Sequence, residues 1–215
     1  MTLLGAIGVK IVLTNTYLRY VNPWMKWPIL AASLVLFVVS IRHLFVRTEE
    51  TANHTLPIVT WLLLLPVLVL FVASPPELGS YAAERRLATN APRPKVQRGL
   101  DTPSDGAVNM TLGDFMSLAE WEPVRSVTSH SVALTGFVSK GPGNAWYVTR
   151  MAITCCAADA LAYRVQVLGA PAPQRDQWIQ VTGRYVDPQK PTPRLNPAIA
   201  AQDVRFVVKP KNTYE

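Results

Sequence analysis

The stretch SVALTGFVSKGPGNAWYVTRMAIT, residues 131–154, decides the fold of the C-terminal half of the chain. On both sides of KGPGN, β-branched and aromatic residues recur with a period of two, which is the spacing typical of strands. The glycines and the proline of KGPGN are typical of a turn. The stretch therefore predicts two strands, 131–139 and 145–154, with a turn between them.

Three further segments with the same pattern follow, at 162–168, 178–186 and 203–209. Five short strands in one small domain predict a closed or partly closed barrel of the OB-like kind, with a small sandwich as the alternative. Gly136 and Gly183 lie inside strand patterns, where a glycine typically marks a bulge or a tight bend. Ahead of the strands, the capping-box spacing of TLGD and a helical apolar period predict a helix over 112–121.

The N-terminal third of the chain is strongly apolar. Residues 56–73 are uncharged, and their length is close to the roughly 20 residues that cross about 30 Å of hydrocarbon. We predict transmembrane helices over 3–21, 27–46 and 56–74, the first facing other helices because Lys10 interrupts it. The predicted fold class is thus membrane-anchored α+β, with two to three transmembrane helices followed by an OB-like barrel.

This reading divides the chain into a transmembrane region over 1–74, a connection over 75–107 and an OB-like β domain over 108–215. Within the connection, PPELGSYAAERRLA predicts a short interfacial helix over 77–88, and the proline-rich remainder predicts a linker. The net charge of +7 suggests an anionic partner. Many of the basic residues follow the last apolar run, so we expect the lipid bilayer rather than nucleic acid. With three spans, the positive-inside rule places the C-terminal part in the cytoplasm.

The only two cysteines are neighbours, Cys155 and Cys156, and Asp159 follows them in ITCCAADA. The alanine-rich sequence predicts one or two helical turns that bring Asp159 near both thiols. Two thiolates and a carboxylate are suitable ligands for zinc, and thiolates also suit Cu(I). Three ligands leave the site open, for completion by His130, a partner or a substrate. The alternative is that both cysteines only pack in the core.

Lys10 is a second candidate, because an intramembrane lysine is a functional hypothesis by default. We predict that it binds a partner subunit, and the alternative is that it snorkels to the interface.

An enzyme is not indicated by the sequence. A nucleophilic cysteine needs a base, and His130 is the one histidine outside the apolar region and its loops. There is no Gly-rich phosphate loop, HExxH or GxSxG pattern. A nucleic-acid-binding OB domain would need a shared basic and aromatic face, for which the candidates are Arg150, Arg164, Arg184, Tyr147 and Tyr163.

The order of motifs PPELGSYAAERR, LTGFVS, MAITCCAADA, WIQVTG and NPAIAAQDVRFVVKPKNTY resembles a YcgQ-like bacterial family of predicted permease subunits. Its most specific part is the core at Cys155, Cys156, Ala158, Asp159 and Ala160. The resemblance implies a transmembrane N-terminal half and a β-rich C-terminal domain in a bacterial cell membrane. It also implies a separate multi-pass permease as partner and a link to the homeostasis of divalent or soft metals.

Overall fold

The structure is a computed structural model that describes residues 2–45, 77–86, 106–121, 131–186 and 197–215. These residues fall into two compact units, Met1–Glu77 and Leu78–Glu215, which we describe separately.

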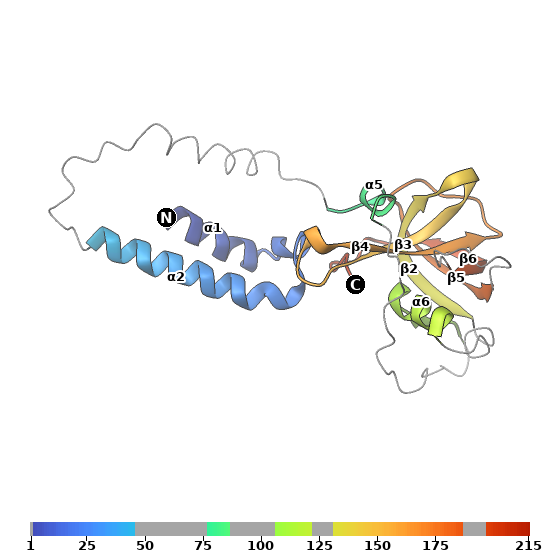
Figure 1. The fold of residues 1–215 in the computed structure, drawn as a ribbon, viewed down its shortest axis with the longest axis horizontal. Coiled ribbons are helices and arrows are strands. Elements are labelled where there is room, and N and C mark those ends of the chain that lie inside the picture. The colour runs from blue at the N-terminus through green and yellow to red at the C-terminus, as the bar shows by residue number, and fades with distance from the viewer. Residues whose placement is uncertain (1, 46–76, 87–105, 122–130, 187–196) are drawn as a thin grey trace. The chain divides into compact units, whose positions relative to one another are not determined.

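The N-terminal unit is a helical hairpin of α1 (Thr2–Leu13) and α2 (Lys26–Phe45), joined by two short 3-10 helices (Figure 1). The two helices approach closely where Gly8 faces Ser33, since a Cβ atom on Gly8 would collide with the hydroxyl of Ser33. That hydroxyl donates a hydrogen bond of 2.7 Å to the carbonyl of Ile29 within its own helix. A small residue at the crossing thus permits tight packing of the hairpin.

The predicted helix over 27–46 is confirmed, with bounds within one residue of α2. Among the described residues, Pro23–Arg42 is the one helix long and apolar enough to cross a membrane. A helix of this kind so near the N-terminus is equally consistent with a signal sequence. The predicted span over 56–74 lies outside the described residues.

The predicted transmembrane helix over 3–21 is wrong in length. The helix α1 has 12 residues, which reach about 18 Å at 1.5 Å per residue, well short of a bilayer. The helix ends before Asn15, which adopts the left-handed conformation with φ 56°. Asparagine tolerates this conformation better than most residues and often ends a helix in this way.

The C-terminal unit contains six strands and two α-helices in its described part (Figure 1). Its elements are α5 (Ser80–Ala83), β1 (Val108–Met110), α6 (Leu112–Trp121), β2 (Val132–Lys140), β3 (Trp146–Ala152), β4 (Leu161–Leu168), β5 (Trp178–Val186) and β6 (Ala198–Phe206).

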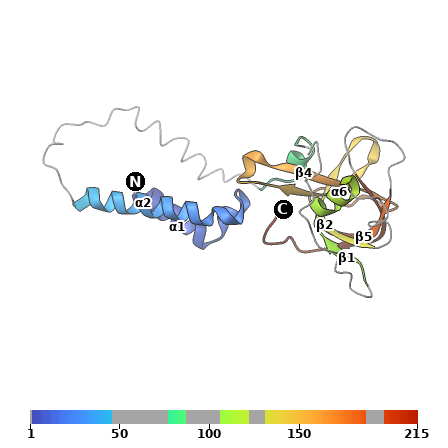
Figure 2. The ribbon, with the colours of Figure 1, turned by 60° about the horizontal axis from the view of Figure 1, so that its bottom comes forward.

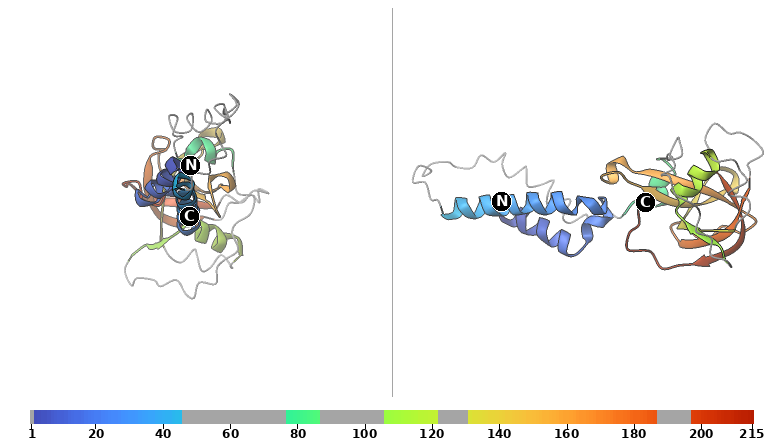
Figure 3. Two further views of the ribbon diagram at one scale, coloured as in Figure 1. Left: turned by 90° about the vertical axis from the view of Figure 1, so that its left-hand side faces the viewer. Right: turned by 90° about the horizontal axis from the view of Figure 1, so that it is seen from below.

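Five of these strands pair in a ring. The order runs β2–β3–β4–β6–β5, and β5 pairs again with β2. The β4–β6 pair is parallel, whereas the other four pairs of the ring are antiparallel. Figures 2 and 3 show these strands curving around a common interior, with α6 packed beside them. The interior is apolar, and Phe115 of α6, Val148, Val165 and Ile179 are each fully buried there.

The sequence predictions for α6 and for the strands β2 to β5 are confirmed to within a few residues. The last strand begins at Ala198, five residues earlier than the predicted 203–209, and β1 was not predicted. The predicted irregularity at Gly183 is confirmed by a shift of the β5–β6 register between Thr182 and Gly183. A Cβ atom on Gly183 would collide with the carbonyl of Ala200, which explains the glycine.

The helix predicted over 77–88 is shorter than expected and belongs to the β domain. Its helical part, α5, is only Ser80–Ala83, and Ala83 is completely buried beside Phe137 and Met151. The amide and hydroxyl of Ser80 donate hydrogen bonds of 2.6 and 2.9 Å to the two carboxylate oxygens of Asp176. These contacts hold α5 on the strands, so the described part of this segment is not a separate interfacial helix.

Candidate metal centre

The strand β3 leads directly into the cysteine pair, and β4 begins shortly after it. The helical turns predicted here are wrong, because the turn is a 3-10 turn over Ala157–Asp159, with Cys156 extended at φ −153° and ψ 172°. The carboxylate of Asp159 accepts hydrogen bonds from the backbone N–H of Thr154 at 3.0 Å and of Cys155 at 2.8 Å. A side chain that binds backbone amides in this way competes with helix formation, which accounts for the difference.

The turn brings the three predicted ligands together. The sulfur atoms of Cys155 and Cys156 are 3.6 Å apart, and one ligand atom from each of the three residues lies within 4.8 Å of the others. Both cysteines are free thiols and are partly exposed. Neither cysteine belongs to the buried core clusters of the described residues.

The carboxylate keeps the neighbouring thiol protonated. The hydrogen bond to Asp159 raises the pKa of Cys155 to about 11, with a smaller contribution from Cys156. In return, the backbone N–H of Cys155 and then its thiol lower the pKa of Asp159. A metal ion must displace the thiol protons, so binding at this site would release protons and would weaken as the pH falls.

Comparison with known proteins places the domain in a family. Residues 106–215, just over half of the chain, match the family model described as the DUF1980 C-terminal domain. The chain belongs to the DUF1980 family. This finding supports the predicted YcgQ-like family. No curated protein matches the chain. A solved structure, the S. pombe Stn1-ten1 complex, is 13% identical over 49% of this chain and 81% of that chain, with a TM-score of 0.25.

In this DUF1980 chain, Arg86 supports the cysteine turn from a distant part of the sequence. Its guanidinium donates to the carbonyls of Ala157 at 2.8 Å and Ala158 at 3.5 Å, and its own carbonyl accepts from the amide of Ala162 at 2.7 Å. The guanidinium therefore holds the backbone of the turn that carries the candidate ligands. Sequence reasoning missed this residue, since 71 positions separate it from Ala157.

The C-terminal residues hold the end of β3, just before the cysteines. The amide of Glu215 donates to the carbonyl of Met151 at 2.9 Å, and the amide of Ile153 donates to the carbonyl of Glu215 at 3.2 Å. The side chain of Glu215 accepts from the amides of Leu112 and Gly113 at 3.0 and 2.9 Å, at the N-terminus of α6. Burial raises the pKa of this carboxyl group. The segment thus links α6 to the strand that positions the turn.

The other predicted site residues lie elsewhere. Lys10 lies on α1 in the N-terminal unit and is exposed, and His130 lies outside the described residues. The shared basic face that a nucleic-acid-binding OB domain would need is not formed by Arg150 and Arg164. Arg150 pairs with Tyr163 across β3 and β4 while Arg164 pairs with Thr149, so the two arginines lie on opposite faces. Arg164 is also buried.

Proposed function

We propose that this DUF1980 protein is a non-enzymatic, membrane-anchored accessory subunit of a permease, and that its C-terminal domain binds a metal ion transiently at Cys155, Cys156 and Asp159. The observation that carries the proposal is the gathering of three ligand atoms within 4.8 Å on one short turn, with both thiols partly exposed. Two thiolates and one carboxylate form a donor set that fits zinc.

The donor set favours Zn(II), because a carboxylate is a common zinc ligand, whereas Cu(I) is selected by soft thiolate ligands. A set of three ligands also leaves the fourth position of a tetrahedral ion open, which suits an ion that is passed to another protein rather than kept.

We further propose that the ring of five strands is an OB-like barrel, in agreement with its order β2–β3–β4–β6–β5 and the closing β2–β5 pair. In such a barrel the cysteine turn is a connection at one end of the strands, where loops commonly carry function.

The membrane part of the proposal rests on α2 and on the apolar sequence over 56–74. If both cross the bilayer, residues 19–26 and the C-terminal domain lie on the same side. Arg19, Lys26 and the basic residues that follow 75 then place the domain in the cytoplasm of a bacterial cell. Lys10, which is exposed on α1, is the proposed contact with the multi-pass permease.

Metal titration of the purified full chain in detergent tests the site. Zn(II) and Cu(I) are each titrated against a competing chelator, with the double variant Cys155→Ser/Cys156→Ser as the matched control. We expect one Zn(II) per chain, displaced at acidic pH, and no stoichiometric binding by the double variant. Equal binding by both proteins, or no binding by the natural sequence while the domain is folded, would refute the proposed centre.

The partnership needs a separate test. A photo-reactive amino acid in place of Lys10 should cross-link to a multi-pass membrane protein in native membranes, whereas the same substitution at Arg184, exposed on β5, should not. Cross-links to lipid alone would refute the role of Lys10.

A further inference from the structure

The strand β6 has one unpaired edge. On one side it pairs with β5 as far as Phe206, but on the other side β4 pairs with it only at residues 198–200. The amide of Val207 donates a hydrogen bond of 3.1 Å to the backbone carbonyl of Trp178 in β5. Because successive residues of a strand direct their backbone groups to opposite sides, those of Val204 and Phe206 face away from β5. Within the described residues, no strand pairs with this edge beyond Ala200.

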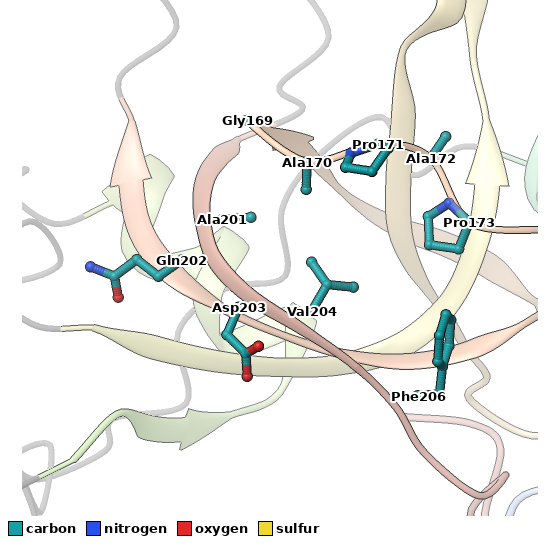
Figure 4. Close-up of a pocket in the computed structure, with 10 residues that line it drawn as sticks. All are labelled: Gly169, Ala170, Pro171, Ala172, Pro173, Ala201, Gln202, Asp203, Val204 and Phe206. Carbon is teal, nitrogen blue, oxygen red and sulfur yellow. The ribbon is translucent and has the colours of Figure 1, made fainter.

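The sequence that follows β4 explains the open edge. Residues 169–174 read GAPAPQ, and a continued parallel register would lay this segment beside β6. Gly169 follows β4 directly and has φ 82°, which lies outside the extended region and turns the chain out of that register. The segment instead diverges from β6 and leaves a groove of about 430 Å³ between residues 169–173 and 201–206 (Figure 4).

The groove has a mixed lining, with Gln202 and Asp203 beside apolar residues of the loop and of β6. In Figure 4 the side chains of Ala170, Val204 and Phe206 point into the space between the loop and the strand. Phe206 is 66% exposed, an unusual position for a phenylalanine that shares the inward face of β5 and β6 with the buried Ile179. Ala170 and Val204 are partly buried against the core, so Phe206 is the exposed apolar side chain here. An exposed apolar side chain on a strand edge that no other described strand pairs with is an arrangement to which an extended peptide adds as a strand.

We propose that this groove binds an extended segment of a partner protein, which adds a strand to the free edge of β6. The segment carries apolar side chains at alternate positions, to contact Val204 and Phe206, and acidic residues at one end. This activity is independent of the metal centre, because none of the residues that line the groove belongs to the cysteine turn.

The positive charge at the end of β6 favours an acidic partner segment. From residue 203 to residue 211 the chain carries three basic residues, Arg205, Lys209 and Lys211, against the single acid Asp203, which is already paired with Arg205 at 2.5 Å. Lys209 and Lys211 are both exposed beyond the end of β6. Pairing of β6 with a second copy of itself would bring two such basic segments together, whereas an acidic segment neutralises them.

Peptide binding tests the proposal. The probe is a fluorescent peptide of sequence DDVTVTVT, and its anisotropy is measured against the full chain in detergent. We expect saturable binding to one site, which also occurs in the Cys155→Ser/Cys156→Ser variant. The control probe is the same peptide methylated on its three central amide nitrogens, which removes backbone donors and should abolish binding. Equal binding of both peptides, or no saturable binding to the folded chain, would overturn the proposal.

Two variants separate the backbone from the side chain. Phe206→Pro removes the N–H that faces the groove without removing a β5 hydrogen bond, whereas Phe206→Ala removes only the ring. We expect Phe206→Pro to bind about tenfold more weakly than Phe206→Ala, the effect of losing one hydrogen bond to a peptide carbonyl. Leu161→Ala, which changes an exposed residue at the start of β4, should bind as the natural sequence does. Thermal unfolding confirms that each variant is folded. Equal affinity of the Pro and Ala variants, or a dimer of the full chain that Phe206→Pro dissociates, would contradict the proposed partner.

Discussion

Replacement of Asp159 by asparagine tests how the turn controls its thiols. The hydrogen bond and charge of Asp159 contribute to a pKa of about 11 for Cys155, against an ordinary value of 9.0. A neutral amide should return this pKa toward 9. At pH 8 the thiolate fraction would then rise about 100-fold, but nucleophilicity falls by about tenfold over the same change in pKa. We therefore expect alkylation of Cys155 to become about tenfold faster.

The assay uses two proteins, Cys156→Ser and Cys156→Ser/Asp159→Asn, so that only Cys155 can react. Reaction with iodoacetamide is followed by mass spectrometry between pH 7 and 11, and the midpoint of the rate profile should move to lower pH when the carboxylate is lost. Asp114→Asn in the same background is the matched control, because the carboxylate of Asp114 accepts a hydrogen bond from the hydroxyl of Thr111 at the start of α6, away from the cysteines, and its loss should leave the rate unchanged. Identical profiles for the two folded proteins would refute the assignment of the raised pKa to Asp159.

Three further predictions concern the stability of the domain. Gly183→Ala should lower the free energy of unfolding by about 2 kcal/mol or more, because the new Cβ collides with the carbonyl of Ala200. The control Gly106→Ala should leave the free energy unchanged, because a Cβ there meets nothing within 4 Å. Urea unfolding measures both. Phe115→Ala should cost about 3–5 kcal/mol in the same measurement, since Phe115 is fully buried. Burial raises the pKa of Glu215 above its ordinary value of 4.5. The protonated side chain therefore stabilises the folded state fully below pH 4.5, and this stabilisation is lost as the pH rises through the folded pKa. In Glu215→Gln, the urea midpoint of unfolding should change less with pH over this range.

The elements that sequence predicted best are those with a local cause. Helix α6 follows from its capping box, in which the hydroxyl of Thr111 accepts from the amide of Asp114 at 3.0 Å. The strands β2 to β5 follow from alternation, and Gly183 from the need for a bulge. Each of these signals lies within about ten residues of the feature that it predicts, so a single sequence contains it.

The elements that sequence missed depend on distant partners. The first part of β6, AIAA, has little strand propensity, and it is a strand because β4 and β5 pair with it on its two sides. The strand β1 has only three residues, and its pairing with β2 spans the whole of α6. The four residues of α5 are held by Asp176, 96 positions away from Ser80. No periodicity within these segments records such contacts.

The candidate centre likewise combines residues that are close in sequence with residues that contact it from distant parts of the chain. The spacing of Cys155, Cys156 and Asp159 was sufficient to predict that the three would meet, although the backbone that joins them is not helical. The support of the turn by Arg86 and by the backbone of Glu215 was not predictable, since both residues contact it across long stretches of sequence. Sequence therefore identified the candidate ligands but not the residues that position them.

Asp159 has two opposed effects on the proposed centre, and their balance decides whether the site can release its metal ion. As a ligand, the carboxylate would add to the affinity for zinc. As a hydrogen-bond acceptor, it stabilises the protonated thiol of Cys155, which competes with the metal. Binding by two thiols then displaces protons, so the site would bind zinc more weakly than two preformed thiolates would. Such a site exchanges its ion readily with a stronger acceptor, as a subunit that passes metal to a permease requires.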